Sequence, residues 1–308
     1  MANNIHVQIP ATTANVGSGF DAIGIALSLY NDIIYEERPE TEDWSITIKG
    51  LGADRLPTEP DKNMVFQAME RAAVFNGVGL PKSGHLTLVN RIPPSRGLGS
   101  SSAAIVGGIL LGDALTGKKM KKDDIFDMAT AMEGHPDNVG PAIFGGLTTS
   151  IMAGEKSLTN ALAIGDDLSF ITVSPAIEVS TEEARKILPK TVAYGDAVCN
   201  VGRVSFLVSS FLAKRYDKLA YGLEDKLHVP YRIGLIPHGE DVLEGAMKAG
   251  AHGATISGSG STLIAFATDH ERAILEAMIS TFAEYDIQSF GHILKADNDG
   301  ARVIIEES

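Results

Sequence analysis

The segment that most constrains the fold of this chain is residues 93–104, PPSRGLGSSSAA. It follows a predicted strand over residues 85–90 and leads into a predicted helix over about residues 101–115. Its glycines let the backbone approach a ligand closely, its consecutive serines offer hydroxyl groups, and the helix start presents unpaired N–H groups with a partial positive charge. The segment therefore predicts a phosphate-binding loop. The alternative is an ordinary loop in which Ser100 caps the helix.

The composition of the chain limits which ligands and partners this loop can bind. The chain has 308 residues, 44% of them hydrophobic and 21% charged, which is enough for one large or two ordinary globular domains. The formal net charge of −13 makes nucleic acid and anionic membranes poor partners, so a local cluster must hold any anionic ligand. The single cysteine, Cys199, excludes an internal disulfide, and the start of the chain lacks signal-peptide features. We therefore expect a cytoplasmic protein with no membrane partner.

Hydrophobic periodicity predicts a mixed α and β chain whose pattern restarts beyond about residue 160. We expect two domains, residues 1–155 and 156–308, with a ligand in the cleft between them. Helices are predicted over residues 63–75, with Asp61 as the cap, and over residues 101–115, 123–132, 181–188, 197–218, 239–249 and 271–284. Strands are predicted over residues 6–9, 29–37, 44–49, 85–90, 144–152, 169–173, 262–267, 292–295 and 303–305.

Three further segments place polar residues at predicted turns. Residues 10–24 bring Asn15 and Asp21 together, either for a ligand or as the bonding groups of a tight turn. In residues 133–139, EGHPDNV, one histidine and a distant cysteine do not suit zinc; Glu133 suits magnesium, or is a solvated helix end. Residues 253–262 form a second Gly-Ser loop, which either closes over a ligand or makes a structural turn.

In their order along the chain these segments resemble the GHMP kinase superfamily, and most closely its homoserine kinases. The resemblance extends over about residues 5–268 and rests on PATTANVGSGFDAIGIAL, PPSRGLGSSSAA, EGHPDNVGPAIFGG and GATISGSGSTLIAF, with STEEARKILP and VPYR in addition. It implies an α+β, two-domain GHMP kinase fold. The N-terminal domain would resemble domain 2 of ribosomal protein S5, and the C-terminal domain would be ferredoxin-like.

The resemblance also implies a reaction: transfer of the γ-phosphoryl group of ATP to the side-chain hydroxyl of L-homoserine, a step towards threonine. It implies ATP and Mg²⁺ as cofactors, with Glu133 and Ser100 at the metal, and a homodimer as a family expectation. By the same resemblance, ATP would bind at Asn63, Met64, Pro93, Pro94, Ser95, Arg96, Gly97, Leu98, Gly99, Ser100, Ser101 and Ser102. Homoserine would contact Asn15, Asp21, His135, Asn138, Arg185 and Arg232, and Gly258, Ser259 and Gly260 would form the third-motif loop.

The implied catalytic residues are Glu133, Asn138 and Ser100. Asn138 stands where relatives such as mevalonate kinase carry an aspartate proposed as a base, and an amide cannot take a proton at neutral pH. We therefore expect catalysis by positioning and charge neutralisation, without a side-chain base. Two alternatives stay open: a GHMP kinase for another small alcohol, such as mevalonate or a sugar, and a relative that binds ligands without turnover.

Overall fold

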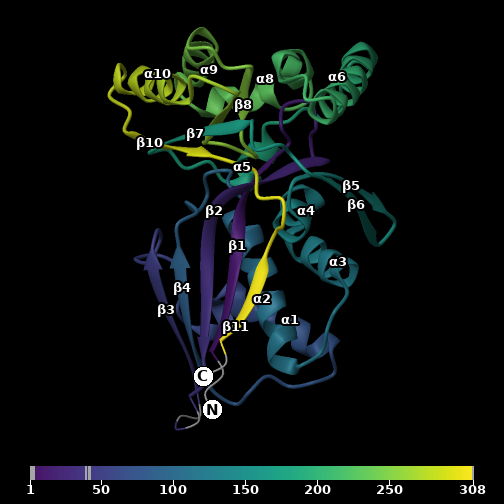
Figure 1. Ribbon diagram of the computed structural model, residues 1–308, viewed down its shortest axis with the longest axis vertical. Helices are drawn as coiled ribbons and strands as arrows, with labels where there is room; N and C mark the ends of the chain where they lie inside the picture. Colours follow the sequence, from purple (N-terminus) through teal and green to yellow (C-terminus); the bar gives the residue numbers. More distant parts are fainter. Residues whose placement is uncertain (1–3, 39, 41–42, 307–308) are drawn as a thin grey trace.

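The computed structural model describes residues 4–38, 40 and 43–306, which form two layered parts (Figure 1). A large sheet with helices on one face makes the lower part, and a small sheet covered by helices makes the upper part. Among the described residues, no helix is both long enough and apolar enough to cross a bilayer.

The large sheet has seven strands in the order β11-β1-β2-β4-β3, with a β5–β6 hairpin attached to the upper half of β2. All pairs are antiparallel except β3 with β4. The strands are β1 (Asn4–Ala14), β2 (Ile23–Glu36), β3 (Trp44–Gly50), β4 (Gly84–Asn90), β5 (Leu147–Ala153), β6 (Lys156–Leu162) and β11 (Arg302–Glu306).

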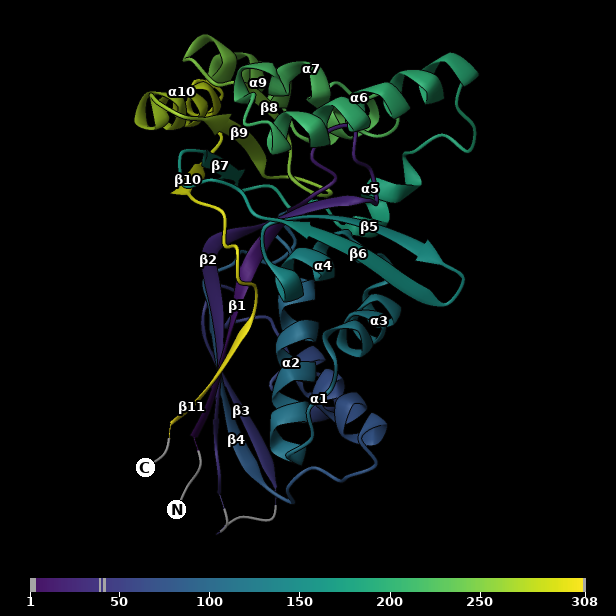
Figure 2. The same cartoon turned by 45° about the vertical axis from the view of Figure 1, so that its right-hand side comes forward.

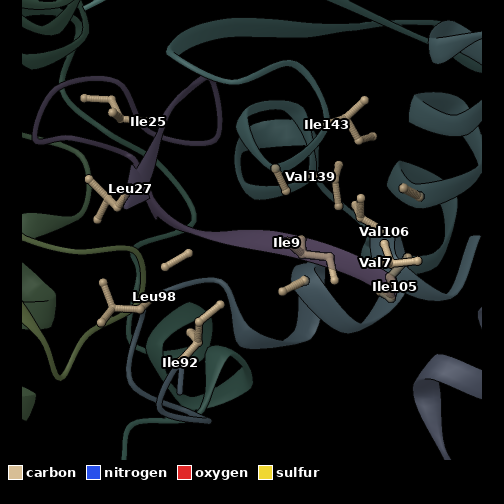
Figure 3. Packing of buried hydrophobic residues seen from close by; sticks show 14 of the residues in the cluster. Val7, Ile9, Ile25, Leu27, Ile92, Leu98, Ile105, Val106, Val139 and Ile143 are labelled. Atoms are coloured by element: carbon tan, nitrogen blue, oxygen red, sulfur yellow. The ribbon is translucent and has the colours of Figure 1, made fainter. Parts of the chain in front are cut away.

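Four helices cover one face of this sheet (Figure 2). They are α1 (Met64–Phe75), α2 (Ser100–Thr116), α3 (Lys122–Glu133) and α4 (Pro136–Phe144). Figure 3 shows the apolar core between the sheet and these helices, where Val7 and Ile9 of β1 face Ile105 and Val106 of α2. This packing fixes α2 against β1, so the N-terminus of α2 has a defined place at the upper end of the sheet.

The small sheet has the strand order β10-β7-β9-β8, and all its pairs are antiparallel. Its strands are β7 (Ser169–Pro175), β8 (Gly253–Ile256), β9 (Leu263–Ala267) and β10 (Ser289–Leu294). Its helices are α5 (Thr181–Lys186), α6 (Tyr194–Leu212), α7 (Leu219–Leu223), α8 (Val229–Arg232), α9 (Gly239–Lys248) and α10 (Glu271–Ala283). Helices between β7 and β8 and between β9 and β10, with strand order 4-1-3-2, make this the expected ferredoxin-like arrangement.

The two sheets do not divide the chain at residue 155. Strand β6 pairs with β5 in the large sheet, and β11, at the end of the chain, returns to pair with β1. The range 156–308 therefore contains two strands that belong to the first sheet. The chain passes from the lower part to the upper part between β6 and β7, and it comes back after β10.

Most predicted elements are confirmed, and the differences have local causes. Residues 136–144 form α4 although Pro141 lies inside it, so the strand predicted from residue 144 begins only at Leu147. Pro136 is tolerated because the first helical position needs no N–H donor. The N-cap of α1 is Asn63 and not Asp61: the side chain of Asn63 accepts a hydrogen bond from the Val65 N–H. The exposed strand β6 and the short β8 and α7 carry too little apolar pattern to be predicted.

Candidate active site

Two adjoining cavities lie at the N-terminus of α2. One, of about 300 Å³, is mostly apolar, and we call it the apolar cavity. The other, of about 190 Å³, is lined mainly by polar and charged side chains, and we call it the polar cavity. Their linings share Ser95, Ser100 and Ser101, so the predicted phosphate loop forms the boundary between them.

The backbone of this loop has the conformation that its glycines allow. Gly97 and Gly99 have φ of +75° and +70°, in the left-handed region, and Gly99 is the N-cap of α2. A Cβ on Gly97 would lie 2.1 Å from the Ser257 carbonyl oxygen, and one on Gly99 would lie 1.9 Å from Thr12 Oγ1. Glycine is therefore required here by close packing against β1 and against the second Gly-Ser loop. Because Gly99 has no side chain to cap α2, the first N–H groups of this helix remain available, and they favour an anionic group.

The residues expected at the nucleotide divide between the cavities. The apolar cavity is lined by Asn63, Met64, Pro94, Ser95, Ser100 and Ser101, together with aliphatic side chains of the large sheet. Gly97, Gly99 and Arg96 line the polar cavity. Pro93, Leu98 and Ser102 line neither cavity and are buried; Figure 3 shows Leu98 among the core residues. These three buried residues anchor the loop, and its other residues line the cavities.

The side chain of Arg96 has a different partner from the one expected. Its Nη1 donates to the carbonyl oxygens of Pro175 and Ile177, at the end of β7, and its Nη2 lies 3.9 Å from the Glu178 carboxylate. Burial lowers the pKa of Arg96, and the charge of Glu178 opposes that effect. Arg96 thus ties the phosphate loop to the upper part of the molecule through its Nη1 group, which protein carbonyls occupy.

The residues expected at the acceptor substrate come from separate elements, and all of them line the polar cavity: Asn15, Asp21, His135, Asn138, Arg185 and Arg232. Glu133, expected at the metal, lines it too, as do Gly258 and Ser259 of the third-motif loop, whereas Gly260 does not. Ser180, Thr181 and Asp137 line it as well. Residues 240 positions apart in the sequence thereby meet in one small space.

Asn15 builds this site and uses both ends of its side chain to do so. It is buried, with φ of +67°, and its Nδ2 donates to the Gly258 carbonyl oxygen over 2.9 Å. Its Oδ1 accepts from the Asp21 N–H, also over 2.9 Å. Asn15 therefore joins the first motif to the third-motif loop and holds Asp21 in place. These are the backbone contacts that the tight-turn alternative expects, and Asn15 also lines the polar cavity.

Asp21 and Arg185 form a two-point ion pair. Arg185 Nη2 lies 2.8 Å from Asp21 Oδ1, and Nη1 lies 3.0 Å from Oδ2. The hydrogen bond to Asp21 raises the pKa of Arg185. Glu182, on the same helix as Arg185, pairs with Lys186 instead. Both side chains line the polar cavity and are more than a third exposed, so solvent screens the pair.

Arg232 differs from Arg185 because it is only 2% exposed. Its Nε donates to the Ala184 carbonyl oxygen over 3.0 Å, and its Nη1 donates to the Gly258 carbonyl oxygen over 3.3 Å. Among the described residues, no carboxylate oxygen lies within 4.0 Å of its guanidinium nitrogens, Glu240 included. Arg232 is thus a buried cation at the wall of the polar cavity whose charge no ion pair neutralises.

The segment after α3 supplies a coupled set of polar groups. His135 Nδ1 lies 2.6 Å from Asp137 Oδ1, and Asp137 is 1% exposed. Burial lowers the pKa of His135, but the hydrogen bond and charge of Asp137 outweigh it and leave that pKa raised. Asn138 Oδ1 accepts from Thr12 Oγ1 over 2.7 Å, so its Nδ2 remains as the donor. Asp137 is absent from the residues expected above, although it stands within the EGHPDN motif.

Glu133 is the acidic group nearest the phosphate loop, and its carboxylate accepts from Ser101 Oγ over 2.9 Å. The expected metal partner, Ser100, lines both cavities beside it. No group of three or more His, Cys, Asp or Glu side chains able to hold a metal occurs in the described part of the chain. One carboxylate, one or two hydroxyl groups and a triphosphate fit Mg²⁺, which retains water and binds through substrate phosphates. They do not fit a metal held by protein ligands alone.

Comparison with known proteins gives a consistent result. Family models described as GHMP kinases N terminal domain and GHMP kinases C terminal match residues 63–146 and 208–284. The chain is 41% identical to homoserine kinase of Carboxydothermus hydrogenoformans over 92% of this chain and 91% of that one. It is 38% identical to homoserine kinase of Persephonella marina over 98% and 99%.

A solved structure agrees. The crystal structure of homoserine kinase from Cytophaga hutchinsonii matches with a TM-score of 0.88 and 32% identity, covering 98% of this chain and 97% of that one. With both family models placed in sequence order and near-complete coverage of curated relatives, the chain belongs to the homoserine kinase family of the GHMP kinases.

Proposed function

We propose that this chain transfers the γ-phosphoryl group of ATP to the side-chain hydroxyl of L-homoserine, giving O-phospho-L-homoserine and ADP in threonine biosynthesis. The observation that carries this proposal is the polar cavity, where Asp21, Arg185 and Arg232 converge beside the N-terminus of α2. A hydroxy amino acid carries the matching groups, namely an ammonium, a carboxylate and a hydroxyl. The names of the relatives point to the same substrate.

The nucleotide occupies the apolar cavity in this proposal. Its adenine lies beside Met64 and the aliphatic side chains of the large sheet, because a flat, weakly polar ring suits an apolar pocket. Its phosphates lie on Ser100, Ser101 and the open N–H groups of α2. The γ-phosphoryl group is then at the boundary between the two cavities, where the acceptor hydroxyl can reach it.

The acceptor occupies the polar cavity. Arg232 and Arg185 bind its carboxylate through charge-assisted hydrogen bonds, and Asp21 binds its ammonium group. Since Asn138 Oδ1 is engaged by Thr12, its Nδ2 donates to the acceptor hydroxyl oxygen and leaves the oxygen's reacting lone pair to be aimed at phosphorus. Asn138 therefore positions the nucleophile and does not deprotonate it.

In this proposal no side chain of the polar cavity serves as a general base. Burial lowers the pKa of His135, but the hydrogen bond and charge of Asp137 leave that pKa raised, and the Asp137 carboxylate is committed to this imidazole. Catalysis then rests on holding the hydroxyl in line and on stabilising the charge of a loose phosphoryl transition state. The hydroxyl proton leaves to the phosphate or to water.

Glu133, with the hydroxyl groups of Ser100 and Ser101, would hold Mg²⁺ against the ATP phosphates. When bound, the ion offsets the negative charge that builds on the phosphate oxygens. Glu133 is the residue of this chain that supplies the charged ligand, and its bond to Ser101 keeps its carboxylate turned to the phosphate loop. A cytoplasmic location and a homodimer stay predictions.

A coupled ADP-release assay across L-homoserine, L-serine, L-threonine, mevalonate and galactose tests the proposal. We expect the amino acids to react better than mevalonate and galactose, because only an amino acid uses the charges of Asp21, Arg185 and Arg232 together, and L-homoserine, the substrate in the names of the relatives, to give the highest kcat/KM. Preference for mevalonate or galactose would favour another GHMP kinase activity. No ADP release above background with any of these alcohols would favour a relative that binds ligands without turnover.

A further inference from the structure

His228 is a buried titratable side chain that the proposed reaction does not use. It is fully buried, and it precedes α8, the single helical turn that ends with Arg232. The Arg232 N–H donates to the His228 carbonyl oxygen over 2.9 Å, which places the two side chains on one face of this turn. His228 thus lies directly behind the guanidinium that the proposed function assigns to the substrate carboxylate.

The contacts of His228 fix which of its ring nitrogens carries the proton. Nε2 lies 2.8 Å from the Gly17 carbonyl oxygen, which can only accept, so Nε2 must be the donor. Nδ1 lies 3.5 Å from Arg232 Nη1, which can only donate, so Nδ1 must be the acceptor. Both contacts are satisfied at once by a neutral imidazole protonated on Nε2.

The surroundings favour that neutral form. Burial lowers the pKa of His228, and the charge of Arg232 acts in the same direction. The carboxylate of Asp225, with Oδ2 3.7 Å from Nε2, and the hydrogen bond to Gly17 raise this pKa, and Asp21 adds a smaller effect in the same direction; burial outweighs them. Asp225 Oδ2 is already engaged by the N–H groups of His228 and Val229 at 2.7 Å each, so it fixes the backbone here.

The hydrogen-bond and ring partners of the Arg232 guanidinium are therefore electrically neutral, and the carboxylates of Asp21, Asp137 and Asp225 act on its charge only at longer range. The neutral partners are the carbonyl oxygens of Ala184 and Gly258, the bare Nδ1 of His228, and the face of Phe20, whose ring centre is 5.0 Å from the guanidinium carbon. The Phe20 ring also stacks on His228 at 5.0 Å. Neutral acceptors orient a cation without cancelling its charge, whereas a carboxylate in their place would compete with the substrate.

We propose that His228 is a positioning residue for substrate selection: its Nδ1 lone pair aims the guanidinium of Arg232 into the polar cavity and leaves that charge free for the carboxylate of the acceptor. This role rests on the proposed function, because it requires an acceptor with a carboxylate. It differs from space filling, which would need the volume of the imidazole but not a bare nitrogen at the δ position.

Two substitutions separate these roles. His228→Asn retains an acceptor at the δ position and loses the bond to Gly17, whereas His228→Gln retains a donor at the ε position and loses the acceptor for Arg232. We expect His228→Gln to have a KM for L-homoserine at least about fivefold above that of His228→Asn, with the same KM for ATP in both. His228→Gln should also lose more of the preference for L-homoserine over 3-amino-1-propanol, which lacks the carboxylate.

The outcomes distinguish the two proposals. If the wild-type enzyme prefers L-homoserine but both variants lose affinity equally, or only their Tm values fall, the role of His228 is overturned and the proposed function stands. If the wild-type enzyme shows no preference for the carboxylate, the proposed function fails, and the role of His228 fails with it.

A measurement on the unsubstituted enzyme covers the case in which a variant does not fold. In 15N-histidine-labelled wild-type protein, we expect His228 to show a protonated Nε2 and an unprotonated Nδ1, and the Nδ1 signal to shift when L-homoserine is added. A proton on Nδ1, or an Nδ1 signal that saturating L-homoserine leaves in place, would overturn the proposal.

Discussion

The two cavities differ in how the chain builds them. Among the described residues, the lining of the apolar cavity comes from residues 9–104, in the large sheet, its first two helices and the loops that join them. The lining of the polar cavity comes from six separated stretches between Asn15 and Ser259, contributed by both parts of the molecule. Of the residues that the structure describes, Lys62 is the one charged side chain that lines the apolar cavity, whereas the polar cavity is lined by Asp21, Arg96, Glu133, His135, Asp137, Arg185 and Arg232.

This difference indicates two modes of recognition. An apolar cavity within one packed unit selects a ligand by shape and by exclusion of water. A charged cavity assembled from both parts selects by the number and placement of ionic partners, and it changes if those parts shift. Affinity for the nucleotide and affinity for the acceptor should therefore respond to different substitutions, and the following experiments test that separation.

The largest effect is expected at the boundary between the cavities. Glu133→Gln should reduce kcat at saturating Mg²⁺ by at least about 10²-fold, because the metal loses a charged ligand where phosphate charge must be neutralised. Steady-state kinetics with varied Mg²⁺ measure this. Glu276→Gln, on the exposed side of α10 and outside both cavities, is the matched control. Wild-type rates in Glu133→Gln would exclude Glu133 from the metal site.

The next effect belongs to the polar cavity alone. Arg232→Met should raise the KM for L-homoserine by about 10²-fold, since a charge-assisted hydrogen bond contributes about 1.5–3 kcal/mol and the substrate carboxylate would be left unpaired. The KM for ATP should not change. Arg272→Met, on an exposed position of α10, controls for loss of a positive charge. An equal rise in both KM values would show that the two cavities are not separate in function.

The reverse experiment fills the apolar cavity. Ala104→Leu adds three carbons to its lining and should raise the KM for ATP by about tenfold, while the KM for L-homoserine stays within about twofold. Ala273→Leu, which is exposed on α10, is the control for the added bulk. If Ala104→Leu changed only the KM for L-homoserine, the assignment of the apolar cavity to the nucleotide would be wrong.

Much of this arrangement could be predicted from the sequence because its parts are local. The phosphate loop, the helix after it and the third-motif loop each depend on glycines and serines that stand together. The side-chain directions could not be predicted: Arg96 lies in the loop motif but bonds to Pro175 and Ile177, and Leu98 points into the core. The local sequence pattern shows which residues form a loop. Only the packing of the folded chain shows whether each side chain points to the cavity or to the core.

The same limit explains the residues that the motifs did not reveal. Asp137 and His228 act through partners, and both are buried where two elements meet. His228 stands four residues before Arg232, and Asp137 stands two residues after His135, so spacing offered a weak signal for each. His228 contacts Gly17, and Asp137 contacts His135 at the wall of the polar cavity. Sequence separation predicts neither contact.

A smaller effect tests the absence of a base. Asp137→Asn should lower the single-turnover rate at saturating substrates by less than about tenfold, because the side chain keeps its shape and the proton need not pass to it. Rapid-quench measurement of phosphoryl transfer gives this rate. A general base typically contributes about 10² to 10⁴, so a loss of several thousandfold would identify Asp137 as the proton acceptor.

The smallest effect concerns stability and changes with pH. The folded-state pKa of His135 is raised above its ordinary value of 6.5, since Asp137 outweighs the effect of burial. Its contribution to stability is therefore fully present below about pH 6.5 and is lost as the pH rises through the raised folded-state pKa. Against His135→Gln, the wild type should be more stable by about 1 kcal/mol at about pH 5.5, and this difference should shrink at about pH 8.5. Urea unfolding at both pH values measures it. A difference that stayed constant or grew with pH would show that His135 is neutral in the folded enzyme, which would restore it as a candidate base in the polar cavity.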